Sequence, residues 1–154
     1  MKARTILVSL AVFFGGFALC LAADANLGTW KLNEAKSKMA PGATKNHTVV
    51  YAAEGDSVKI TVDGVSGDGK PTHSDWTGKY DGKDYPVTGD PNSDARSYKR
   101  VDDRTLDFAV KKDGKTTLTG RVAVSADGKS RTVTTTSTDS SGKKVTSSAF
   151  YDKQ

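Results

Sequence analysis

The sequence VKITVD, residues 58–63, alternates strictly between apolar and polar side chains. A period of two residues is typical of a β-strand that turns one face to a core and the other to water. Similar alternation returns in later segments, whereas no stretch after residue 28 repeats apolar residues with the 3.6-residue period of a long helix. The sequence therefore predicts an all-β protein.

Turn signals separate the alternating segments. The tripeptide Asp-Gly-Lys occurs at residues 68–70, 81–83, 113–115 and 127–129. Asp-Gly suits a type I′ hairpin, because both central residues of that turn need a positive φ, which Gly adopts freely and Asp tolerates. Ten strands are predicted, at residues 28–33, 46–53, 57–64, 72–80, 84–88, 95–101, 105–112, 115–124, 130–138 and 143–152.

Ten strands joined by hairpins form an antiparallel up-and-down meander. An open sheet of that size would expose two long edges, and closing it into a barrel removes both edges and shelters one alternating face. We therefore expect a single closed barrel over residues 24–154, with little or no helix beyond one turn around residues 35–39.

The alternation also predicts which side chains point into the barrel. If Trp30 points inward, alternation along the other predicted strands places the remaining candidates for the cavity lining inside with it: Ile60, Trp76, Tyr80, Tyr98, Phe108 and Val122. Residues 130–138 contain one apolar residue, Val133, among threonines. That segment predicts a half-polar interior.

Two arginines alternate with Tyr98 on one predicted strand. If Tyr98 points inward, Arg96 and Arg100 enter the barrel too, and they would then need an anionic ligand or internal carboxylates. The alternative places both at the rim or outside, which the rarity of buried charge favours.

The first 23 residues predict a secretory signal peptide. Lys2 and Arg4 precede an uncharged run that ends in small residues, and a mature start between Ala23 and Asn26 follows. An uncleaved anchor is the alternative, since about 20 apolar residues span a bilayer. Cleavage predicts a secreted or periplasmic protein with no membrane span, and it removes Cys20, the single cysteine.

Both ends of the mature chain resemble known barrel families. Gly28-Thr29-Trp30-Lys31-Leu32 resembles the Gly-x-Trp opening of the lipocalins and the first strand of intracellular fatty-acid-binding proteins. Phe150-Tyr151-Asp152-Lys153 is similar to the last strand of those binding proteins. Both families belong to the calycin group of ligand-holding barrels. The resemblance implies a small, secreted, bacterial lipocalin-like domain.

The chain also departs from those families. Fatty-acid-binding proteins carry two helices after the first strand, for which residues 34–45 leave no room. Their arginine that holds the ligand's carboxylate is matched here by Ala149. The resemblance leaves the ligand unassigned, and we expect apolar bulk, rather than a carboxylate, to set its affinity.

Three functions follow as hypotheses. The leading one is a barrel that binds a small apolar or amphipathic ligand; the second is a structural or interaction barrel filled by its own side chains; the third is a calycin-type enzyme. We expect no enzyme, because no catalytic elbow, triad or paired acid is recognisable. We also expect a monomer without a cofactor.

Metal and nucleic-acid binding are not expected either. His47 and His73 lie on different predicted strands, and residues 90–101 lack the Gly and the bidentate Glu of a calcium loop, which makes 90–94 a polar turn. Removing Lys2 and Arg4 lowers the formal net charge from +5 to +3, so the charge does not imply nucleic acid.

Overall fold

The structure is a computed structural model that describes residues 24–154; the predicted signal peptide and Cys20 lie outside the described residues. The ten predicted strands are confirmed, with ends that differ by at most a few residues. They are β1 (Gly28–Leu32), β2 (Lys45–Glu54), β3 (Ser57–Val65), β4 (Pro71–Gly78), β5 (Asp81–Thr88), β6 (Ala95–Asp102), β7 (Thr105–Lys112), β8 (Lys115–Val124), β9 (Ser130–Thr138) and β10 (Lys144–Lys153).

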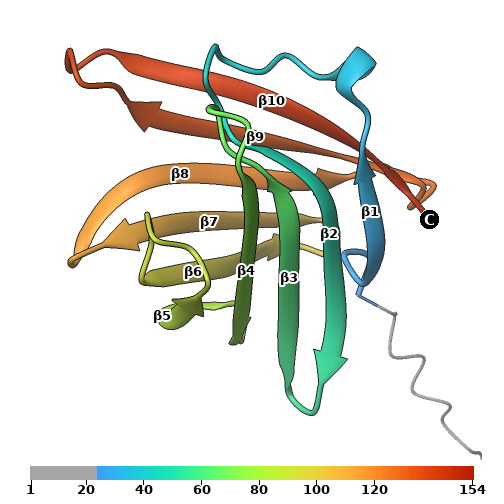
Figure 1. Cartoon of the computed structure of the whole chain (residues 1–154). Coiled ribbons are helices and arrows are strands. Elements are labelled where there is room, and N and C mark those ends of the chain that lie inside the picture. The colour runs from blue at the N-terminus through green and yellow to red at the C-terminus, as the bar shows by residue number, and fades with distance from the viewer. Residues whose placement is uncertain (1–23) are drawn as a thin grey trace, which may run out of the picture.

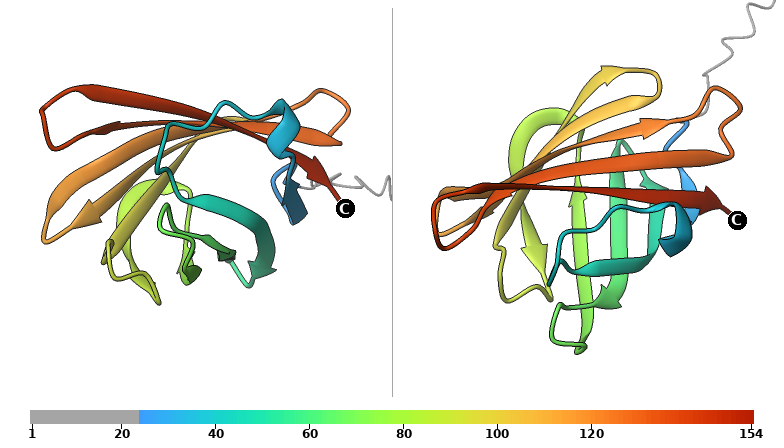
Figure 2. Two further views of the ribbon diagram at one scale, coloured as in Figure 1. Left: turned by 45° about the horizontal axis from the view of Figure 1, so that its top comes forward. Right: turned by 90° about the horizontal axis from the view of Figure 1, so that it is seen from above.

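The strands form one closed antiparallel barrel, as predicted (Figure 1). Each strand pairs with its sequence neighbour, and β1 closes the ring against β10. Figure 2 shows β8–β10 running across β2–β4, so the two halves of the barrel cross each other. In the described chain the helical content is a single 3₁₀ turn, η1 (Glu34–Lys36), which Asn33 caps through its side chain. The helical pair of fatty-acid-binding proteins is therefore not present between β1 and β2.

The pairing register builds the core from the alternating face. Ile60 lies opposite Tyr51 on one side and opposite Trp76 on the other. All three are buried, while Lys59, which precedes Ile60 on β3, is exposed. The hydrophobic effect acts on every second residue of a strand, and this period is what selects the inner face.

The turns are only partly of the predicted kind. Asp113 and Gly114 both have a positive φ, as a type I′ turn requires. At 68–70, 81–83 and 127–129 only the glycine is in that region. The aspartate instead caps the turn from its side chain: Asp81 accepts from the Lys83 amide and Asp127 from the Lys129 amide, both at 3.0 Å. A local hydrogen bond thus replaces the strained aspartate backbone.

The N-terminal residues of the described chain seal one end of the barrel. Trp30 Nε1 donates to the carbonyl oxygen of Asn26 at 2.8 Å, and Asn26 is fully buried. Asp24 forms an ion pair with Arg100 of β6 at 3.0 Å. This closed end lies opposite the end where the β3–β4, β5–β6 and β7–β8 hairpins turn, because the hairpins of a meander alternate between the two ends. Within residues 24–154, no helix has the length and apolar character needed to cross a membrane.

Candidate ligand-binding cavity

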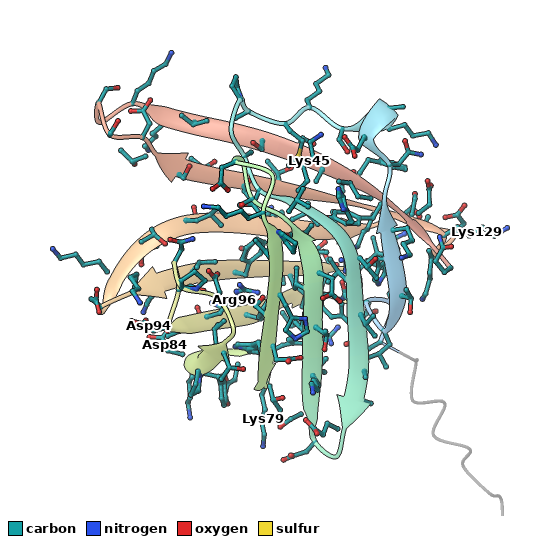
Figure 3. All side chains as sticks on the ribbon, in the orientation of Figure 1. Lys45, Lys79, Asp84, Asp94, Arg96 and Lys129 are labelled. Atoms are coloured by element: carbon teal, nitrogen blue, oxygen red, sulfur yellow. The ribbon has the colours of Figure 1, made fainter. Side chains whose placement is uncertain are left out.

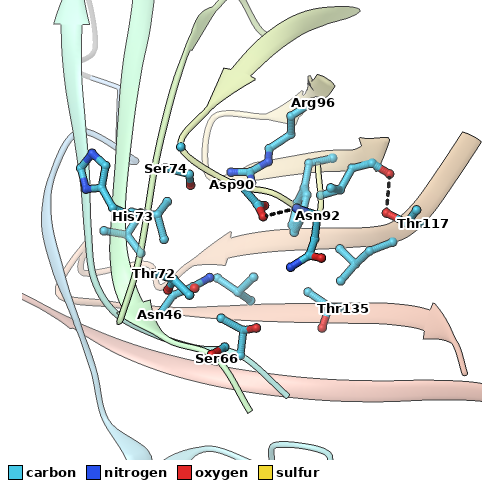
Figure 4. Close-up of a pocket in the computed structure, with 18 of the residues that line it drawn as sticks. Asn46, Ser66, Thr72, His73, Ser74, Asp90, Asn92, Arg96, Thr117 and Thr135 are labelled. Carbon is cyan, nitrogen blue, oxygen red and sulfur yellow. Dashed lines mark hydrogen bonds between the residues drawn. The ribbon is translucent and has the colours of Figure 1, made fainter. Parts of the chain in front are cut away.

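A cavity of about 900 Å³ occupies the half of the barrel away from the closed end (Figure 4). Its rim comes from three hairpins, represented by Asp68 in β3–β4, Asn92 in β5–β6 and Lys112 in β7–β8. Known small-molecule pockets measure about 300–1,000 Å³. The barrel is therefore not filled by its own side chains, and its interior has room for a drug-sized molecule.

The cavity wall is apolar and aromatic, with a belt of hydroxyl groups. Its apolar and aromatic lining comprises Val49, Tyr51, Val62, Tyr98, Phe108, Val110, Leu118, Val122, Val133 and Tyr151. The hydroxyl groups belong to Thr44, Ser66, Thr72, Ser74, Thr117, Thr135 and Ser137. Thr135 and Ser137 come from β9, so the predicted half-polar interior of that strand is confirmed.

Four of the predicted lining residues reach the cavity, namely Arg96, Tyr98, Phe108 and Val122. Among them, Tyr98 is stacked on Phe108 with ring centroids 5.4 Å apart. Trp76 packs behind Tyr98 at 4.8 Å and donates from Nε1 to the backbone carbonyl of Arg96 at 2.8 Å. This bond fixes the indole of Trp76 against the wall.

The other predicted lining residues, Trp30, Ile60, Trp76, Tyr80 and Arg100, are not among those that line the cavity. Trp30, Ile60 and Trp76 are at most 1% exposed in the packed part of the barrel, and Tyr80 lies behind Tyr98 at 6.1 Å. Alternation places Trp30, Ile60 and Trp76 on the inner face, where they are buried, but it does not give the depth of a residue along the barrel.

Depth also separates the two arginines. β6 runs from the rim toward the closed end, so Arg96, four residues before Arg100, lies at the cavity. Arg100 emerges at the closed end, where it pairs with Asp24 and lies 4.9 Å from the ring centroid of Tyr80. Arg96 therefore lines the cavity toward its rim, whereas Arg100 lies outside the cavity, so of the two arginines only Arg96 faces the space inside the barrel. In Figure 3, Lys79 and Lys129 project away from the barrel, whereas Arg96 lies within its outline.

A second guanidinium in the cavity wall, that of Arg131 on β9, was not predicted from the sequence. Arg131 is 2% exposed, and its guanidinium carbon lies 4.6, 4.7 and 5.0 Å from the ring centroids of Trp30, Tyr51 and Tyr151. The sequence does contain a pattern that could have predicted its direction. Arg131, Val133 and Thr135 occupy alternate positions, which puts the arginine on the same face of the strand as the valine. The polar character of that strand hid which face was inward.

The tyrosines beside Arg131 stay protonated at neutral pH. Burial raises the pKa of Tyr151 to about 12 and raises the pKa of Tyr51 further above its ordinary value. Their hydroxyl groups therefore remain neutral and can donate hydrogen bonds.

The predicted polar turn and His73 both form hydrogen bonds with neighbouring residues of the described chain. Asp90 accepts from the Asn92 amide at 2.8 Å and from the Ser93 hydroxyl at 2.6 Å, so the polar turn at 90–94 is confirmed. His73, at the cavity edge, hydrogen-bonds to Asp63 and Asp75. Among residues 24–154, no group of three His, Cys, Asp or Glu side chains is arranged to hold a metal ion.

Comparisons with known proteins give no family for the chain. No protein-family model matches it, and neither does any curated protein. Among solved structures it is similar to EF1p2_mFAP2b, described as bound to DFHBI, with 10% sequence identity over 86% of this chain and 97% of that chain, and a TM-score of 0.48.

Proposed function

We propose that the protein is an exported, monomeric, lipocalin-like barrel that binds one small amphipathic molecule in its cavity. The observation that carries the proposal is the cavity of about 900 Å³ with an apolar and aromatic wall. A barrel whose task is purely structural gains stability by filling such a space, because each missing contact in a core costs packing energy. The retained space therefore favours a ligand over the filled structural barrel.

The composition of the wall supports an amphipathic rather than a purely apolar molecule. Val110, Leu118 and Phe108 offer apolar contact, while Arg96 and Arg131 place charged donors in the same cavity. Ligand pockets commonly combine an apolar lining with a few polar groups that fix orientation. Binding without turnover is part of the proposal, and recovery of the ligand with unchanged mass would support it.

Titration with N-phenyl-1-naphthylamine, a neutral apolar dye that brightens in apolar surroundings, tests the proposal on residues 24–154. Burial of a molecule of this size in a preformed pocket commonly gives micromolar affinity, about −8 kcal/mol. We expect saturable binding in that range. Absence of saturable binding up to roughly millimolar dye would instead support the structural barrel.

Two tryptophan variants on one strand provide a matched test of the site. Leu118→Trp fills the cavity from its wall, whereas Thr119→Trp adds the same indole to the outer face of β8. Dye affinity should fall at least tenfold in Leu118→Trp and stay within twofold in Thr119→Trp. Equal effects of the two variants would place the dye outside the cavity.

A further inference from the structure

The guanidinium of Arg131 is the least satisfied polar group of the cavity. No group among residues 24–154 forms a hydrogen bond to its Nε or Nη1, although both atoms are buried, and no carboxylate of the described chain forms an ion pair with it. The surrounding rings of Trp30, Tyr51 and Tyr151 offer cation–π attraction, which stabilises the charge but accepts no hydrogen bond in the guanidinium plane.

An unpaired buried charge with free donors is costly for a protein to keep. Arg131 lines the cavity, so a bound molecule can accept the hydrogen bonds that the protein leaves open. Nearer the rim, Arg96 repeats this pattern with a buried Nε that has no partner among the described residues. Two guanidinium groups thus line one cavity, and both carry open donors.

The acidic groups of the cavity do not neutralise this charge. Asp68 and Asp90 are the acidic residues that line it, and both belong to rim hairpins. Asp68 pairs with Lys70 at 2.8 Å, and Asp90 is occupied by its own turn. The inner part of the cavity is therefore positive, and its protonated tyrosines add neutral donors rather than negative charge.

We infer that the ligand is an amphipathic carboxylate that enters head first, seats its carboxylate on Arg131, and leaves its apolar tail against Phe108, Val110 and Leu118 toward the rim. This inference rests on the proposed function. A guanidinium presents parallel N–H donors that match the two oxygens of a carboxylate. The expectation that apolar bulk alone sets affinity is replaced, because an arginine of β9 supplies the positive group that Ala149 of β10 lacks.

Competition with ligands of equal chain length tests the inference. Decanoate and decanol displace the bound neutral dye from the protein at about pH 8, where the acid is fully ionised. We expect decanoate to bind at least tenfold more tightly than decanol. Decyl sulfate, which has the same chain and a different oxyanion, should bind more weakly than decanoate, because the paired oxygens of the carboxylate match the guanidinium fork.

Arginine variants locate the head group. Arg131→Met keeps apolar volume in the aromatic cage and should reduce the preference for the acid to within twofold, with dye affinity retained. Arg121→Met is the matched control: Arg121 lies on the outer face of β8, paired with Asp107 at 2.6 Å, and the preference should not change. Arg131→Lys should keep part of the preference, since it retains the charge and loses the planar fork.

The outcomes separate the inference from the proposed function. Dye binding with equal affinities for decanoate and decanol overturns the inference alone, even if Arg131→Met does not fold. A preference that survives Arg131→Met but disappears in Arg96→Met also overturns it, because the head group then sits near the rim. Failure of the dye to bind at all counts against the proposed function itself.

Discussion

The contact between Gly120 and Phe108 makes a quantitative test of the packing around the cavity. The two residues face each other across β7 and β8. A Cβ added to Gly120 would lie 2.5 Å from Cε1 of Phe108, closer still to Cζ, and 2.8 Å from the carbonyl oxygen of Thr134. Carbon atoms prefer a separation of about 3.5–4.0 Å, so the phenyl ring must move by about 1 Å in Gly120→Ala.

The expected cost follows from two opposing contributions. Overpacking of a core costs about 1–3 kcal/mol, while replacing Gly by Ala in a strand returns about 0.5–1 kcal/mol of backbone entropy. Gly120→Ala should therefore lose about 0.5–2 kcal/mol of unfolding free energy. Phe108 lines the cavity, so its displaced ring should also weaken dye binding.

A double-mutant cycle isolates the ring contact. Phe108→Leu removes the Cε and Cζ atoms but leaves the contact with the Thr134 carbonyl oxygen, so Gly120→Ala should cost less in that background without becoming neutral, with a favourable coupling of about 1 kcal/mol. Equilibrium urea unfolding of the four proteins measures it. Gly78→Ala is the control, because its added Cβ meets Trp76 and Tyr85 rather than Phe108, and its effect should add to that of Phe108→Leu. If the effects of Gly120→Ala and Phe108→Leu add within about 0.5 kcal/mol, the added methyl group does not press on the phenyl ring.

Three further predictions concern the core, the pH dependence and the N-terminus. Leu106→Ala should cost about 2–5 kcal/mol in urea unfolding, because Leu106 has no exposed surface, whereas exposed Lys59→Ala should change stability by about 0.5 kcal/mol or less; equal losses would show that the faces are misassigned. Hydrogen bonds to Asp63 at 2.6 Å and to Asp75 raise the pKa of His73 above 6.5, so its contribution to stability should be complete below that pH and lost as pH rises through the raised value. Proton NMR titration checks this, and a pKa at or below 6.5 would contradict it. Intact-mass analysis of exported protein should show a mature chain that keeps Asp24, because a start at Ala25 would lose the ion pair with Arg100 and a start at Asn26 would place a charged amino group on a buried residue; a chain starting at Ala25 or Asn26 would contradict this.

The strands and their inner faces could be predicted from the sequence alone. Residues 58–63 alternate because a strand exposes successive side chains to opposite environments, and this local rule holds wherever one face is apolar. The positions of the turns follow equally from the Asp-Gly pairs, although the local hydrogen bonds of Asp81 and Asp127 change the turn type.

The position of each residue along the barrel axis was decided only by the tertiary structure. Arg96 and Arg100 share one face of β6, yet one lines the cavity and the other pairs with Asp24 at the closed end. Arg131 lies in a strand whose two faces are both polar, so its inward direction depends on pairing with Tyr151 across β9 and β10. Alternation is a property of one strand, whereas depth and enclosure arise from the register of all ten strands, to which residues far apart in the sequence contribute.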